Sequence, residues 1–239
     1  MISVIIPTLN EAERLPALLR QLAGENTPHE VIVVDGGSSD ATREIASAHQ
    51  AQVILSVPGR GQQLVAGVHA ARGDTLFFLH ADSVFPAGGL ARIEATLTNE
   101  PNCPGGNFRL IFNGDSDFSR WLTGFYAWLR RRGFYYGDSA VFVRREIYDR
   151  IGGIRPIALM EDYDFNRRLE RAGPTCCIEK PPLVTSSRRF EGRSAAGIVW
   201  GWLEIHALYH LGVAPHWLAK RYEVQRRMAR PRPMQGRPA

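Results

Sequence analysis

Cysteine is scarce in this sequence, and there is no long uninterrupted hydrophobic run. The 239 residues contain three cysteines, Cys103, Cys176 and Cys177. Because their number is odd, two are adjacent and none has CxxC spacing, the sequence excludes a disulfide framework and a cysteine zinc site. The N-terminal segment carries no basic region and turns polar at Asn10, so we expect no signal peptide. These features predict a reducing compartment and a cytoplasmic location.

Glycine-rich loops that bind phosphate are also missing. No GxGxxG follows the first apolar run and no GxxxxGK[ST] occurs anywhere, which argues against dinucleotide-binding and P-loop proteins. The 23 glycines and 15 prolines are scattered without a period, so collagen-like and low-complexity chains are excluded. With 44% hydrophobic and 22% charged residues, the composition is that of a globular protein large enough to fold without a disulfide or metal.

Most of the chain has no excess of positive charge. The formal net charge is +5, but residues 220–239 contain seven Lys or Arg and one Glu, a balance of +6 that leaves −1 for the rest. The basic residues lie in a Pro-rich end without a recognition fold, so we expect no nucleic acid partner.

The first hundred residues alternate between apolar runs and helical periodicity. The runs predict strands at 3–7, 30–35, 52–57 and 75–80. Helical signals follow them at 13–23, 41–49, 62–71 and from Pro86 to Leu97. Continuously apolar runs are typical of parallel strands covered on both faces. The sequence therefore predicts an α/β fold with a mostly parallel, doubly wound sheet, whose ligands bind beyond the carboxyl ends of the strands.

Beyond residue 100 the order of elements changes. Strands are predicted at 106–112 and 138–143, and helices at 118–132 and 160–172. Residues 195–214 are apolar but contain Glu204, His206 and His210, which indicates an amphipathic segment rather than a membrane span. We expect one domain over 1–194, an amphipathic helical extension over 195–228 and a disordered basic tail over 229–239.

Polar and acidic side chains follow three of the predicted strands. The segments are Pro7-Thr-Leu-Asn-Glu11, Asp35-Gly-Gly-Ser-Ser-Asp40 and His80-Ala-Asp82. Each segment by itself fits a helix cap. Three together at one sheet edge favour a cation or a donor-rich ligand, because packed carboxylates otherwise repel. Asp82, directly after a buried strand, is the carboxylate suited to Mg²⁺ or Mn²⁺.

The order of these motifs resembles that of family 2 glycosyltransferases over about residues 1–190. The matching pieces are Ser-Val-Ile-Ile-Pro-Thr-Leu-Asn-Glu11, Val-Ile-Val-Val-Asp35-Gly-Gly-Ser-Ser-Asp40, the strand-end acidic motif and Met160-Glu-Asp162. Pro-Gly-Arg60 and His-Ala-Asp82 are similar to the bacterial radical-SAM/selenodomain-associated subgroup. The resemblance implies a GT-A fold, the nucleotide-diphospho-sugar transferase fold. It also implies metal-dependent transfer of a sugar from a nucleoside diphosphate sugar to an acceptor hydroxyl, with inversion.

Roles on the donor side follow from the same resemblance. Pro7, Thr8 and Glu11 match the nucleoside pocket, and Asp35 with Gly36 matches the contact to the base. Arg60 matches a basic residue that reaches base or phosphate. Ala81 and Asp82 match the end of the metal-binding DxD motif. His80 stands where that motif usually has Asp, so it either faces the nucleotide or packs as a core histidine.

Roles on the acceptor side are also implied. Glu161-Asp162 matches the motif that supplies the catalytic base, with Asp162 ranked before Glu161, although both carboxylates also suit a helix N-terminus. Gly137-Asp138 resembles a segment near the acceptor site. Arg188 and Arg189 fit a clamp on the departing diphosphate, or a solvated face.

Several features have competing explanations. Asp115-Ser-Asp117 is a second DxD, but it follows Asn-Gly and reads as a turn and helix cap. His206 and His210 have zinc-ligand spacing without a third ligand. The aromatic C-terminal segment and its basic tail fit either an anionic membrane surface, on the inner face for a lipid-linked acceptor, or a core-closing helix. A nucleotidyltransferase and a non-enzymatic membrane-surface protein are the alternative functions.

Overall fold

The computed structural model describes residues 1–114, 116–186 and 194–228. The chain divides into two compact units, Met1–Ser186 and Ser187–Ala239. The elements of the first unit are, in order, β1 (Ile2–Thr8), α1 (Leu15–Ala23), β2 (His29–Asp35), α2 (Thr42–Ala48), β3 (Gln52–Leu55), α3 (Arg60–Ala70), β4 (Thr75–Phe78), α4 (Gly89–Asn99), β5 (Gly105–Phe112), α5 (Asp117–Arg130), the 3-10 turn η1 (Gly137–Ser139), β6 (Val141–Arg144), α6 (Arg145–Arg150), α7 (Glu161–Ala172) and β7 (Cys176–Thr185).

The strands of the first unit form one mixed sheet in the order β3-β2-β1-β4-β6-β5-β7. Strands β1 to β4 pair in parallel, β6 runs antiparallel to both β4 and β5, and β7 is parallel to β5. The predicted α/β class and the mostly parallel sheet are confirmed. The antiparallel strand β6 lies between the parallel strands of the first half of the chain and β5 of the second half, because it pairs with both β4 and β5.

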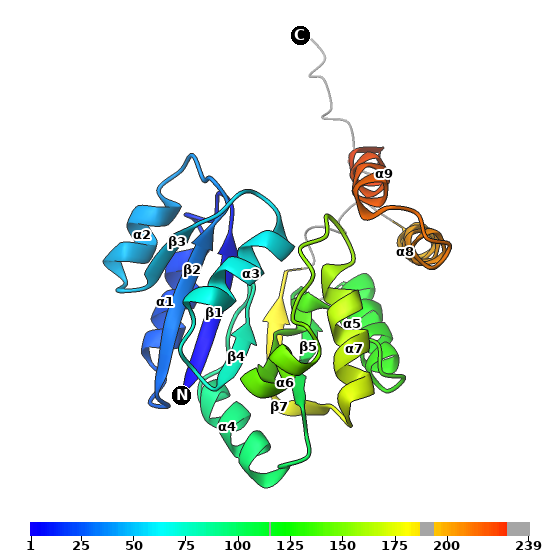
Figure 1. Ribbon diagram of the computed structural model, residues 1–239. Helices are drawn as coiled ribbons and strands as arrows, with labels where there is room; N and C mark the ends of the chain where they lie inside the picture. Colours follow the sequence, from blue (N-terminus) through cyan, green and yellow to red (C-terminus); the bar gives the residue numbers. More distant parts are fainter. Residues whose placement is uncertain (115, 187–193, 229–239) are drawn as a thin grey trace. The chain divides into compact units, whose positions relative to one another are not determined.

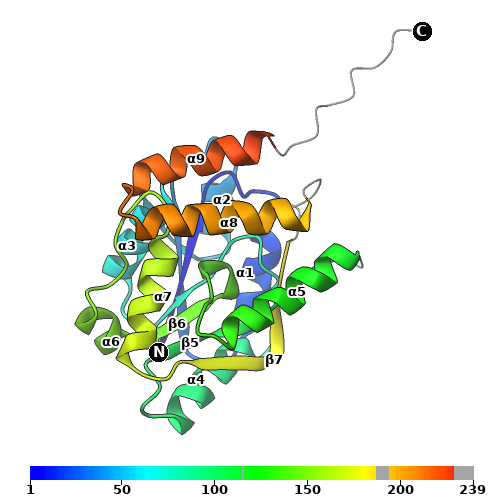
Figure 2. The same ribbon diagram turned by 90° about the vertical axis from the view of Figure 1, so that its right-hand side faces the viewer.

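Helices cover both faces of the sheet, and α1 and α3 lie on opposite sides of it (Figures 1 and 2). On the α3 side, Ile5, Val34 and Phe78 pack with Leu64 of α3 and Phe165 of α7 in one buried cluster. A second core contains four phenylalanines whose neighbouring rings lie 5.5–6.4 Å apart, Phe77, Phe85, Phe108 and Phe142. These two apolar layers hold the carboxyl ends of the central strands in fixed register.

The structure corrects several predicted boundaries. Residues 138–140 are not strand: Gly137–Ser139 form η1, Ala140 has a φ of 52°, and β6 begins only at Val141. The sequence missed β7 and the short α6. The helix that we expected to begin near Pro86 begins at Gly89.

The second unit is described over residues 194–228. It contains α8 (Ala195–His210) and α9 (Pro215–Met228), so the apolar segment predicted over 195–214 is one helix followed by a turn. The Ser194 hydroxyl caps α8 by accepting from the Gly197 amide at 3.1 Å, and Arg221 of α9 pairs with Glu204 of α8 at 2.8 Å. Over the described residues, no helix combines the length and apolar character that crossing a membrane requires. The predicted tail, 229–239, lies outside the described residues.

Candidate active site

The carboxyl ends of three central strands meet at one edge of the sheet. Thr8 and Asp35 are register partners at the ends of β1 and β2. Leu79, directly after β4, donates its amide to the Ile5 carbonyl at 3.0 Å. The three motifs that follow β1, β2 and β4 therefore lie at the same edge, although they are far apart in the sequence.

Asp35 is fully buried at this edge and holds the loop after β2. Its Oδ2 accepts from the amides of Gly37 and Ser38 at 3.1 and 2.9 Å. The Ser38 hydroxyl donates to Oδ1, and the Thr8 hydroxyl lies 3.5 Å from the same oxygen. Asp35 therefore shapes the loop itself, and its contact with a base stays a prediction.

Gln63 of α3 fastens the ends of β1 and β2 to each other. Its side-chain amide donates to the carbonyls of Thr8 and Val34, both at 2.8 Å. A Cβ on Gly36 would lie 3.1 Å from that amide, so glycine allows the close approach. The sequence analysis did not single out Gln63. The one feature of the sequence that could have indicated Gln63 is that a polar residue stands on the predicted buried face of a helix.

Glu11 and Asp82 form an acidic rim next to these loops. Both residues are partly exposed, and Ala81 between β4 and Asp82 is buried. Burial raises the pKa of Glu11, and the nearby carboxylates of Asp82 and Asp40 add to that rise; Arg14, 3.0 Å away, only partly offsets it. Glu11 and Asp82 therefore repel each other, which is the situation that a bound cation relieves.

Arg60 connects this edge to the start of α7. Its guanidinium pairs with Glu161 through Nε and with Asp162 through Nη2, the latter at 2.7 Å. Its Nη1 lies 3.4 Å from Nε2 of His80. Four predicted site residues, from α3, α7 and the loop after β4, thus converge. Arg60 faces the two carboxylates, whereas the resemblance had implied that it reaches a nucleotide.

The pairing fixes the charge state of Asp162. Burial alone would raise the pKa of this carboxyl, but the Arg60 cation and the amides of Gly137 and Tyr163, at 2.9 and 2.7 Å, outweigh it and hold the pKa below its usual range. The carboxylates of Asp162 and Glu161 also hold the pKa of Arg60 above its usual value, although burial alone would lower it. Asp162 is therefore ionised at neutral pH.

The η1 turn closes the cluster from the other side. A Cβ on Gly137 would lie 3.2 Å from Oδ2 of Asp162, so this glycine allows the backbone to reach the carboxylate. Asp138 is buried, accepts from the Tyr126 hydroxyl of α5 at 3.2 Å, and adds its negative charge to the field at Arg60. Gly137 and Asp138 therefore lie next to Asp162, and their role toward an acceptor stays a prediction.

Left-handed backbone conformations occur next to several of these candidate site residues. Non-glycine residues with positive φ include Asn10 at 56°, Ala140 at 52° and Met160 at 70°. They lie in the loop after β1, directly after η1, and directly before Glu161. Such conformations cost about 1–3 kcal/mol each and gather at functional sites. None of the three is glycine, and the sequence analysis did not predict these conformations.

Other candidates lie elsewhere or outside the described residues. Arg188, Arg189 and Asp115 are not among the described residues. Nδ1 of His206 donates to the Trp202 carbonyl at 2.8 Å, a contact within α8. Among the described residues, no group of three or more His, Cys, Asp or Glu side chains is arranged to hold a metal ion.

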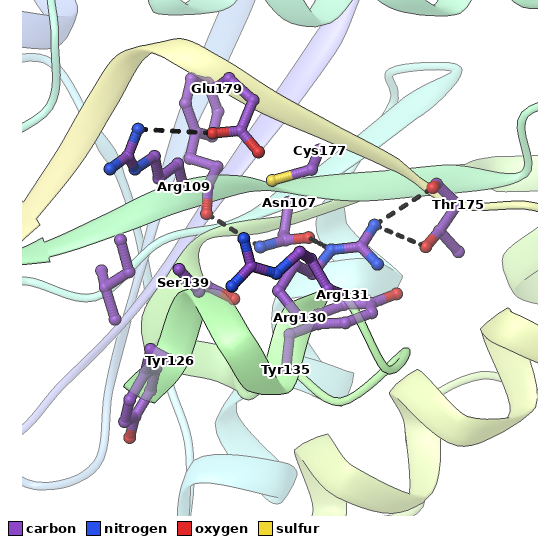
Figure 3. A pocket seen from close by; sticks show the side chains of 13 residues that line it. Asn107, Arg109, Tyr126, Arg130, Arg131, Tyr135, Ser139, Thr175, Cys177 and Glu179 are labelled. Carbon is purple, nitrogen blue, oxygen red and sulfur yellow. Dashed lines mark hydrogen bonds and ion pairs between the residues drawn. The ribbon is translucent and has the colours of Figure 1, made fainter. Parts of the chain in front are cut away.

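A cavity of about 400 Å³ lies away from this cluster, between α5, β5 and β7 (Figure 3). Arg130 forms one wall: it donates to the Asn107 side chain at 2.6 Å and to the Thr175 hydroxyl at 2.8 Å, and it lies over the Tyr135 ring. Of the predicted site residues that the structure describes, none lines this cavity. The predicted site residues converge at the sheet edge and not here, so we place the candidate active site at that edge.

Sheet order and site together define the GT-A class of nucleotide-diphospho-sugar transferases, and solved structures share this fold. One is S. aureus TarS 1–349 in complex with UDP-GlcNAc, with a TM-score of 0.63 and 18% identity over 78% of this chain and 58% of that one. Another is the mannosyltransferase PcManGT from Pyrobaculum calidifontis in complex with GDP-Man and Mn²⁺, with a TM-score of 0.63 and 20% identity over 94% and 73%. The chain spans about three fifths of the TarS fragment.

Sequence comparison gives the family. The profile of Glycosyl transferase family 2 matches residues 3–157. A PGL/p-HBAD biosynthesis glycosyltransferase of Mycobacterium tuberculosis (strain ATCC 25177 / H37Ra) is 32% identical in a 211-residue alignment that covers 77% of this chain and 72% of that protein. The chain belongs to glycosyl transferase family 2 and is an enzyme of that class.

Proposed function

We propose that the chain transfers a sugar from a nucleoside diphosphate sugar to an acceptor hydroxyl. The observation that carries this proposal is Asp162, an ionised and largely buried carboxylate that is held by Arg60 and the Gly137 amide. The glycosyltransferase relative and the GT-A fold support the same reaction class. A nucleotidyltransferase and a non-enzymatic membrane-surface protein gain no support from these observations.

The donor would occupy the carboxyl edge of the sheet. Pro7, Thr8, Glu11, Asp35 and Gly36 would line the nucleoside pocket. His80, Ala81 and Asp82 would face the diphosphate. Asp82 and the adjacent Glu11 are oxygen donors of the kind that Mg²⁺ and Mn²⁺ bind through one or two carboxylates plus substrate phosphates. When bound, that ion would neutralise the departing diphosphate.

Asp162 would act as the general base, with Glu161 next to it. Its carboxylate takes the proton of the acceptor hydroxyl while that oxygen forms a bond to the anomeric carbon. The bond from the anomeric carbon to the diphosphate breaks, and the nucleoside diphosphate leaves with the electron pair. A single displacement of this kind inverts the anomeric centre, and base assistance contributes roughly 10²–10⁴-fold. Arg188 and Arg189 would bind the departing diphosphate.

The acceptor would enter beside Gly137 and Asp138. A lipid-linked acceptor at the inner face of a membrane fits the exposed apolar residues of α8 and α9 and the basic end of the chain. These exposed residues are Trp200, Leu203 and Trp217. Membership of the radical-SAM/selenodomain-associated subgroup, with a cytoplasmic location, is part of the same proposal.

Thermal shifts with a panel of nucleoside diphosphates, each with and without Mn²⁺, test the donor site. We expect one base to stabilise the protein, only with the metal, and no such shift in Asp82→Ala. Asp149→Ala removes an exposed carboxylate of α6 and serves as the matched control. If Asp82→Ala responds like the native chain, the metal assignment is wrong. Pyrophosphate release from a nucleoside triphosphate and a sugar phosphate would instead support a nucleotidyltransferase.

A further inference from the structure

Helix α5 carries a row of four aromatic side chains along one face. This aromatic ridge consists of Phe118, Trp121, Phe125 and Trp128. The centroids of successive rings lie 5.8, 5.2 and 5.7 Å apart, with interplanar angles of 28°, 9° and 18°. Trp121 and Trp128 are 38% and 42% exposed. Phe118 and Phe125 are half-buried. Scattered single hydrophobic residues are ordinary on a surface, but two exposed tryptophans within one continuous row of rings are typical of an interaction site.

Basic side chains border the ridge. The Arg132 guanidinium lies 3.9 Å from the centroid of the Trp128 ring and extends the row by one cation. Arg120 and Arg131 are exposed on the neighbouring face of the helix. The one carboxylate described on α5, Asp117, pairs with Arg120 at 2.5 Å. Arg131 and Arg132 therefore leave the C-terminal end of the ridge positively charged.

The opposite face of α5 is fastened to the sheet. Leu122 and Tyr126 are buried, and the Tyr126 ring lies 4.9 Å from that of Phe112 in β5. The Phe112 amide donates to the Thr123 hydroxyl at 3.1 Å. The buried side of α5 therefore fastens the helix to the sheet, while Trp121 and Trp128 of the ridge stay exposed.

We propose that the aromatic ridge docks the protein on an anionic lipid bilayer. Tryptophan rings favour the interface between headgroups and acyl chains, and a helix with aromatic rings on one side and arginines beside them is typical of interfacial binding. The arginines complement acidic headgroups, and each such residue near an anionic surface strengthens binding about fivefold. A second copy of the chain is a poorer partner, because a symmetric contact would bring the same arginines together.

Docking through α5 would present the active site to the bilayer. The chain passes from the end of α5 directly to η1, and Tyr126 of α5 bonds to Asp138 there at 3.2 Å. Gly137 in the same turn bonds to Asp162. Hydrogen bonds thus connect the helix of the docking surface, through η1, to Asp162. The docking itself does not depend on the proposed function. Only its purpose, which is to bring the active site close to a membrane, rests on that function.

Vesicle co-sedimentation of the full chain tests the proposal. Vesicles of phosphatidylcholine alone are compared with vesicles that contain 30% phosphatidylglycerol. We expect binding to the anionic vesicles, and a drop of at least about tenfold in Trp121→Ser/Trp128→Ser. Trp121→Tyr/Trp128→Tyr keeps interfacial rings and should retain most of the binding. Trp200→Ser/Trp217→Ser removes two exposed rings from α8 and α9 as a comparison.

Two double charge-reversal variants distinguish docking through α5 from nonspecific electrostatic attraction of the whole chain to the vesicles. Arg131→Glu/Arg132→Glu should abolish binding, whereas Arg43→Glu/Arg92→Glu, with the same change in net charge on exposed residues of α2 and α4, should not. Unchanged binding in the α5 variants overturns the proposal, including the case in which only the α8 and α9 variant loses binding. A ridge covered in solution by a second copy gives that same result. Nucleotide thermal shifts should be unchanged in all these variants, so a failure of docking is distinct from a failure of the transferase assignment.

Discussion

The charge balance of the candidate site depends on a single cation, Arg60. Its side chain is 31% exposed, while those of Glu161 and Asp162 are 4% and 14% exposed. Two carboxylates removed from water in this way would be costly without the guanidinium between them. The same contact keeps Asp162 ionised and aimed at η1. Arg60 is therefore a positioning residue for the proposed base.

Asp162→Asn should separate transfer from binding. The amide oxygen can still accept from Gly137, so the local fold and nucleotide binding should be retained. Without a group that takes a proton, turnover should fall at least about 10²-fold. Steady-state kinetics and the nucleotide thermal shift measure the two effects. Asp164→Asn, two residues further along α7 and paired with Arg155 and Arg168, is the matched control. Near-normal turnover in Asp162→Asn would reject the base assignment.

Arg60→Gln should lower stability in a pH-dependent way. The pKa of Asp162 is depressed in the folded protein, so the pair stabilises the fold above the unfolded pKa of about 3.9, and this contribution is lost as the pH falls through the lower folded value. At pH 7 the variant should lose about 1–3 kcal/mol of unfolding free energy, since buried acceptors lose their donor. The difference from the native chain should shrink below about pH 4.

Arg155→Gln is the control for that experiment. Arg155 also pairs with a carboxylate of α7, Asp164, at 3.2 Å, but its side chain is exposed, so the loss should stay within about 1 kcal/mol. Because removal of the Arg60 charge raises the pKa of Asp162, the acidic limb of the pH–rate curve should also move to higher pH in Arg60→Gln. Equal stability of the two variants in urea melts at pH 7 would contradict the role given to Arg60.

At the scale of the element, α3 links the core to the site. Its first residue, Arg60, enters the cluster, Gln63 ties together the ends of β1 and β2, and Leu64 and Val68 enter the core. Gly67 lets the helix lie directly on the sheet, because a Cβ there would be 2.4 Å from Cγ2 of Ile5. The position of the site therefore depends on how closely α3 packs.

The same substitution in two helices tests this packing. Gly67→Ala should destabilise the protein by about 1–3 kcal/mol, since the buried Ile5 must move. Gly124→Ala in α5 meets nothing within 4 Å, so it should be neutral or stabilise by up to about 1 kcal/mol through helix propensity. Urea unfolding of both variants provides the measurement. A Gly67→Ala variant as stable as the native chain would show that α3 is free to shift.

Much of the first half of the fold was predictable, because its signals are local. Apolar runs and helical spacing indicated β1 to β4 and their helices, and parallel pairing then placed the three motifs at one edge. Strand β7 was missed because it contains Pro181 and Pro182, which remove ladder donors. Such residues are tolerated there because β7 is at the edge of the sheet. The pairing of Arg60 with Glu161 was not predictable, since no local pattern connects residues so far apart.

At the scale of the whole molecule, function and basic charge lie in different parts of the chain. The unit Met1–Ser186 contains every predicted site residue except Arg188 and Arg189. The net positive charge, in contrast, comes from residues 220–239. The proposed chemistry therefore depends on local pairs such as Arg60 with Asp162, and the net charge of the chain is relevant only to its surfaces and partners.

The reaction rate of the three cysteine thiols measures how readily the sheet edge opens in the intact protein. Cys103 is buried, and burial raises the pKa of Cys176 to about 12 and that of Cys177 to about 11. The thiolate is the reactive form, so at pH 8 the native protein should react with a thiol reagent about 10²-fold more slowly than a free cysteine. In urea, without reductant, three thiols should react rapidly. Fewer than three would indicate a disulfide and contradict the reducing compartment, whereas fast reaction of the native protein would show that β5 and β7 separate readily at the sheet edge.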